Sequence, residues 1–187
     1  MTSFLILNIS PTNINLKRDV LMAQNEILKR SKDTILKRWT EKIFKSYPEE
    51  TRRFLDTQKD QFQNPVRHIF KKELNRLLNE LIDSFNRDNI EGALDNIIAI
   101  RAVQDFTPSE ALSFIFDLKG IIEENMGGGI VDIFKRIDEM ALIAFDIYMQ
   151  RKETIYRLRA NAMANQVSGL LRKKGLLSEL SQWGASQ

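Results

Sequence analysis

The sequence predicts an all-α protein of about six helices that ends in a long C-terminal helix. Apolar residues recur at three- and four-residue intervals over most of the 187 residues, which is the spacing of one helix face. We find no alternation of apolar and polar residues of the kind that marks a half-buried strand. With only eight glycines and four prolines, the chain has room for long helices, and its length suits one domain with a sizeable core.

The first 21 residues differ from those that follow, because they are rich in Asn and Ser, contain Pro11 and lack periodicity. We expect residues 1–21 to form a poorly ordered arm, with Met22 as a candidate natural start, and residues 22–160 to form the domain. A first helix is expected over residues 24–46. Pro48, followed by two glutamates, suits the start of a short second helix.

Asn64 followed by Pro65 is the pattern of a helix N-cap with proline in the first turn. It predicts a third helix that runs to about Phe85. A fourth helix is expected over residues 89–103.

The sequence Thr107-Pro108-Ser109-Glu110 has the pattern of a capping box, which opens a helix to about residue 125. Three glycines at positions 127–129 are expected to end it. The long last helix then begins near Ile130, and residues 161–187 are expected to be a helical extension and tail.

The composition excludes several classes of site. Without cysteine, the chain cannot form a disulfide, a thiolate zinc site, an iron–sulfur cluster or a thiol nucleophile. Its single histidine, His68, leaves little scope for a metal cluster or a catalytic triad. We therefore expect no enzyme activity, no metal and no cofactor.

No apolar run approaches the roughly 20 residues that span a bilayer. The segment FLILNI near the N-terminus is too short for a signal-peptide core and has no basic residues before it. We therefore expect a cytoplasmic protein without a membrane partner.

An arginine interrupts the apolar face of the fourth helix. Arg101 follows that face at helical spacing, and a buried guanidinium needs a partner. The segment MALIAFDIYM in the last helix is apolar nearly all round and contains one charge, Asp146. We predict a structural Arg101–Asp146 ion pair, with Asp105 as the alternative partner. A sharper alternative makes Arg101 and Gln104 the floor of a pocket for a small anionic ligand, with Asp146 and His68 as further candidate ligand-binding residues.

His68 lies roughly 120° around its helix from the centre of the apolar stripe, so a solvated histidine is expected. The run RHIFKKEL weakly resembles a histidine phosphotransfer module, although no glycine follows the lysine. Phosphotransfer through His68 is the alternative function.

The last helix carries a heptad-like seam of apolar residues, namely Met149, Tyr156, Ala160, Met163, Val167 and Leu170. Part of this seam lies beyond the expected domain, so a partner helix should cover it, and we expect a homodimer. The segment 151–174 also holds seven basic residues against Glu153 alone, a charge of +6. We read it as a solvated face, since no aromatic interleaving favours nucleic acid.

Four segments occur together in one family: KDTILKRW, FQNPVRHIF, IRAVQDFTPSEALSFIFDLK and ALIAFDIYMQRKETIYRLR. In this order they resemble the N-terminal domain of RsbR/RsbRD-type proteins, the co-antagonists of the kinase RsbT in bacterial stress signalling. The resemblance covers about residues 27–159.

The resemblance implies a globin-like, haem-free sensor domain similar to those of stressosome proteins. Such domains dimerise and act on other signalling proteins without catalysis. If the helix from Asn64 corresponds to globin helix E, residues 89–103 correspond to helix F, and they contain no histidine to bind haem. Family members continue into a STAS output domain, which residues 160–187 are too short to hold. Output through the basic last helix and its tail, to an unknown signalling protein, is therefore expected.

Overall fold

The computed structural model describes residues 11–57, 60, 62–126 and 131–173. These residues form six helices and no strand, which confirms the predicted all-α class and the long C-terminal helix. The helices are α1 (Pro11–Lys45), α2 (Glu49–Thr57), α3 (Pro65–Ile82), α4 (Arg87–Ala102), α5 (Pro108–Met126) and α6 (Val131–Lys173).

All six helices contribute to one hydrophobic core. α3 packs on α4, α6 packs on α4 and α5, and α1 packs on α5 and α3. Trp39 of α1 is fully buried, and its indole N–H donates a hydrogen bond of 2.6 Å to the carbonyl of Phe114 in α5. Because a buried indole N–H needs an acceptor, this bond fixes α1 against α5.

The predicted start of α3 is confirmed. The Asn64 side chain accepts a hydrogen bond of 2.9 Å from the Arg67 amide, and Pro65 is the first helical residue. α3 ends at Ile82, three residues before the predicted end, and Phe85 has a φ of 50°. A residue in this left-handed region cannot continue a right-handed helix.

The capping box at the start of α5 is also confirmed. The Thr107 amide donates to Glu110 Oε2 at 2.9 Å, and the Glu110 amide donates to Thr107 Oγ1 at 3.3 Å. The Thr107 side chain and amide together hold the pKa of Glu110 below its usual value. The glycines at 127–129 and Ile130 lie outside the described residues.

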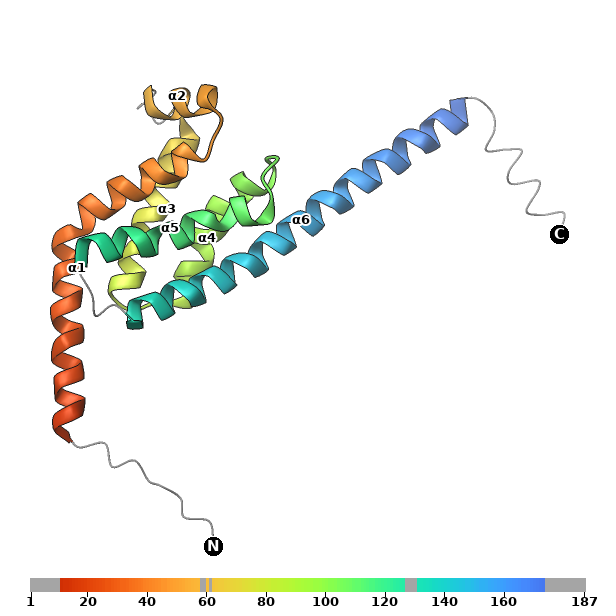
Figure 1. Cartoon of the computed structure of the whole chain (residues 1–187). Helices are drawn as coiled ribbons and strands as arrows, with labels where there is room; N and C mark the ends of the chain where they lie inside the picture. The colour runs from red at the N-terminus through yellow and green to blue at the C-terminus, as the bar shows by residue number, and fades with distance from the viewer. Residues whose placement is uncertain (1–10, 58–59, 61, 127–130, 174–187) are drawn as a thin grey trace, which may run out of the picture.

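The first helix begins earlier than expected. α1 begins at Pro11 rather than near residue 24, residues 1–10 lie outside the described residues, and the N-terminal arm stays a prediction. Figure 1 shows the first half of α1 running away from the other helices. A helix segment without a core to face needs no periodic apolar stripe, and this explains why periodicity failed to predict it.

The last helix extends well beyond the body (Figure 1). Ile155 is the last residue of α6 that packs against the core, and every residue from Tyr156 to Leu170 is exposed. We call residues 156–173 the overhang. Residues 174–187 lie outside the described part of the chain. Among the described helices, none has the length and hydropathy needed to cross a membrane.

Candidate functional site

Arg101 joins three helices at one corner of the core. It is fully buried, as predicted. Its Nε donates to the Ala111 carbonyl at 2.7 Å, and its Nη2 donates to the Glu110 carbonyl at 2.7 Å. Its Nη1 donates to Ser46 Oγ at 3.1 Å. One side chain of α4 thus holds the first turn of α5 and the residue that follows α1.

Three aromatic rings surround the same guanidinium. Its central carbon lies 4.4 Å from the ring centre of Phe106, 5.4 Å from that of Tyr47 and 5.8 Å from that of Phe114. Cations are attracted to ring faces at these distances. Burial lowers the pKa of Arg101, and the neighbouring Tyr47 acts in the opposite direction. The charge is therefore stabilised by carbonyl dipoles and ring faces.

The predicted Arg101–Asp146 ion pair is wrong. Asp146 is exposed on α6, and the alternative partner Asp105 is exposed after α4. Among the described residues, Arg101 forms no ion pair within 4 Å. Ala144 and Tyr148 of α6 face the core, so Asp146 between them falls on the outer side of the helix.

Gln104 lies beside Tyr47 and is half-buried. The Tyr47 hydroxyl and Gln104 Oε1 are both buried, and within the described residues neither makes a hydrogen bond. Burial raises the pKa of Tyr47, while Arg101 and Gln104 act to lower it. Neither Arg101 nor Gln104 lines the cavities described below, and the anion pocket stays a prediction.

His68 is exposed on α3, as its position around the helix predicts. Its side chain makes no described hydrogen bond or ion pair, and the structure does not bring it to Arg101. In the described ranges, no group of three or more His, Asp or Glu residues could hold a metal ion.

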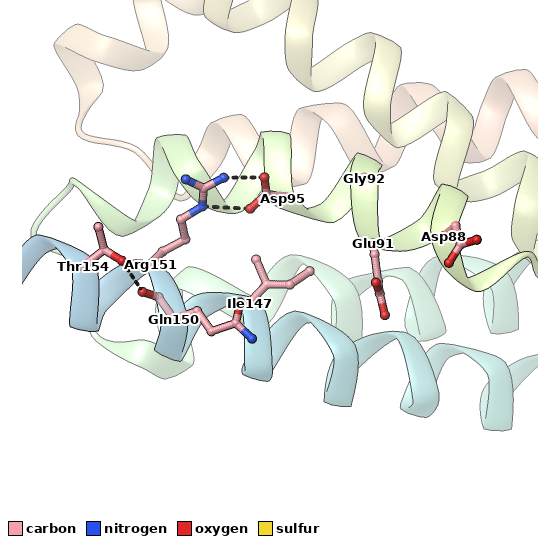
Figure 2. Close-up of a pocket in the computed structure, with 8 residues that line it drawn as sticks. All are labelled: Asp88, Glu91, Gly92, Asp95, Ile147, Gln150, Arg151 and Thr154. Atoms are coloured by element: carbon pink, nitrogen blue, oxygen red, sulfur yellow. Dashed lines mark hydrogen bonds and ion pairs between the residues drawn. The ribbon is translucent and has the colours of Figure 1, made fainter.

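A cavity of about 550 Å³ opens between α4 and α6. Figure 2 shows Asp88, Glu91 and Asp95 of α4 on one side and residues of α6 on the other. Arg151 forms a bidentate ion pair with Asp95, in which its Nε donates at 2.8 Å. Both partners are partly exposed, so the pair is worth at most about 1 kcal/mol. The cavity is acidic, and the described structure aims no buried polar group into it.

The outer side of α6 is apolar well before the overhang. Leu142 is 70% exposed and Phe145 is 48% exposed, although both lie in the segment that packs on the body. The predicted seam began at Met149 and did not include these two residues. The apolar character all round of the segment from Met140 to Met149 was the available signal, since a helix that packs on one side needs apolar residues on that side only.

These residues continue the predicted seam. Steps of three, four and seven residues place them on one side of the helix. We call the set the α6 stripe: Leu142, Phe145, Met149, Tyr156, Ala160, Met163, Val167 and Leu170. All its members are exposed.

A second apolar surface adjoins the α6 stripe. A hollow of about 490 Å³, which we call the α5–α6 groove, has a mainly apolar surface; its lining residues are Pro108, Ser109, Leu112, Ser113, Phe116 and Asp117 of α5 and Phe145 of α6. Phe116 is 52% exposed. Because Phe145 belongs to both, the groove and the stripe form one continuous surface. A large contiguous apolar surface on a folded protein marks an interaction site, and it is our candidate functional site.

Comparison with known proteins gives one result. Residues 33–163 match the family model described as "RsbT co-antagonist protein rsbRD N-terminal domain". The match covers most of the chain and confirms the predicted resemblance. No curated protein and no solved structure matches the chain. The globin-like arrangement of the helices therefore stays a prediction.

Proposed function

Because the chain belongs to the RsbT co-antagonist protein rsbRD N-terminal domain family, we propose that it is a non-enzymatic sensor that acts through protein–protein contacts as a homodimer. Membership implies a role in the regulation of stress signalling. Domains of this family are regulatory and generally non-catalytic.

The exposed α6 stripe is the observation that supports the proposed dimer. The overhang is a helix of about five turns without a body beneath it, whereas helices in proteins owe most of their stability to tertiary packing. Its side chains Tyr156, Met163, Val167 and Leu170 are large, apolar and exposed. A partner helix that covers them stabilises the overhang and removes apolar surface from water.

The input to this sensor is a small anionic ligand or another signalling protein, and its output is a change in the geometry of the dimer. A signal moves such an equilibrium only by its different affinity for two conformations. The polar corner of Arg101 and Gln104 is the proposed place for an anion. We expect no haem, and the purified protein should show no Soret absorption band.

The dimer is tested by the mass in solution. Sedimentation equilibrium of the chain at about 50 μM should give twice the chain mass of 21.7 kDa, because interfaces of this kind hold at micromolar concentrations. The monomer mass at that concentration would exclude the proposed dimer.

Histidine phosphotransfer is a second candidate, favoured by the exposure of His68 on α3. It predicts that a histidine kinase labels the wild-type chain and not a His68→Ala variant. The primary proposal predicts equal labelling of the two at background level.

A further inference from the structure

We propose that α6 pairs antiparallel with the α6 of a second copy, so that each overhang lies across the partner's α5–α6 groove. This inference rests on the proposed homodimer and specifies its orientation. Three observations carry it: the spacing of the α6 stripe, the charge along α6 and the reach of the overhang.

Six of the other seven members of the α6 stripe pair off symmetrically about Tyr156, and Ala160, opposite Lys152, is the exception. Met149 and Met163 lie seven residues before and after it, Phe145 and Val167 eleven, and Leu142 and Leu170 fourteen. In an antiparallel pair with a two-fold axis at Tyr156, each residue faces the one at the same separation on the other side. The axis therefore sets Met163 against the partner's Met149. In the same way, Val167 faces the partner's Phe145 and Leu170 faces the partner's Leu142.

The charge along α6 favours the same orientation. The overhang contains Arg157, Arg159, Arg172 and Lys173 and no acidic residue. With the axis at Tyr156 the overhang runs along the partner's residues 139–156, which carry Glu139, Asp146 and Glu153 against Arg151 and Lys152, a net charge of −1.

A parallel pair would place two overhangs of charge +4 side by side, and like charges at such a seam repel. An antiparallel pair instead places each overhang of charge +4 along a partner segment of charge −1. It also brings Arg157 within one turn of the partner's Glu153.

The reach of the overhang fits the groove. From Tyr156 to Leu170 the helix rises about 21 Å, and from Tyr156 back to Leu142 it rises the same distance. The tip of the overhang therefore ends beside the partner's Leu142 and Phe145, at the edge of the partner's α5–α6 groove. There Val167 and Leu170 cover Phe116 as well. The overhang of a second copy thus supplies the helix that covers the α6 stripe and the α5–α6 groove.

Disulfide cross-linking tests the orientation, and the absence of native cysteine removes background reaction. Met149→Cys and Met163→Cys are made as single variants, and their masses are checked for dimer formation. The antiparallel pair predicts a cross-link when the two variants are mixed and oxidised, and none in either variant alone. In each single variant the two thiols would be about 21 Å apart, whereas a disulfide needs Cα atoms within about 7 Å.

Leu158→Cys is the matched control, because Leu158 is also exposed on α6 but lies on the opposite side from the stripe. It should give no cross-link with either variant. Cross-linking of each single variant alone would show a parallel pair and overturn the inference. A dimer without any cross-link would also overturn it, by placing the interface elsewhere. A monomer mass would instead refute the proposed dimer itself.

Discussion

Replacing Arg101 with alanine is expected to lower the free energy of unfolding by about 3 kcal/mol or more. The substitution leaves a cavity where a fully buried side chain filled the space between three rings. It also removes the three hydrogen bonds that join α4 to Ser46, Glu110 and Ala111. Urea denaturation followed by far-ultraviolet circular dichroism measures the loss.

Three further variants show which feature of Arg101 stabilises the fold. Arg101→Lys keeps the charge but lacks the planar fork, so it should also destabilise, though less than alanine. Tyr47→Phe removes a hydroxyl without a described partner and should change stability by less than about 0.5 kcal/mol. Arg53→Ala replaces an exposed arginine of α2 and should also change the free energy of unfolding by less than about 0.5 kcal/mol. An Arg101→Ala variant as stable as Arg53→Ala would contradict the structural role of the buried guanidinium.

Replacing Met163 with glutamate is expected to weaken dimerisation by at least about 100-fold, because the two-fold axis buries two unpaired carboxylates at once. Met163 is exposed on the overhang, beyond the last residue of α6 that packs against the core, so the fold of the monomer should be unchanged. Sedimentation equilibrium over a range of concentrations measures the dissociation constant.

Leu158→Glu is the control for this change. Leu158 is 62% exposed and Met163 66%, and both lie on the overhang, but only Met163 belongs to the α6 stripe. Leu158→Glu should therefore dimerise like the wild type. Equal weakening by both variants would mean that the stripe does not define the interface.

Local signals in the sequence predict most of the fold. Asn64-Pro65 and the capping box at Thr107 act through side chains that bond amides three residues away, so their effect is visible in the sequence. α3 ends instead where Asp83 leaves the helical conformation, followed by the left-handed Phe85, and neither residue type predicts this end. The start of α1 at Pro11 has no such local signal, because the sequence before Met22 carries no periodic apolar stripe.

The sequence locates the candidate site less well, because the site depends on how the helices pack against one another. The burial of Arg101 follows from its place in an apolar face, but its partners are backbone carbonyls, a hydroxyl and rings. Backbone carbonyls are available at every residue, so no pattern identifies which of them a buried arginine will use. The seam of the overhang was visible from its spacing. Its continuation through Leu142 and Phe145 required the structure, which shows the side of α6 that the body leaves uncovered.

Hydrogen exchange of the backbone amides of residues 156–170 shows whether a second copy covers the overhang. These amides should be protected at concentrations where the chain is dimeric and lose protection on dilution, because a helix without tertiary packing opens readily. Fast exchange at every concentration, in a chain whose body remains protected, would show that no second copy covers the overhang.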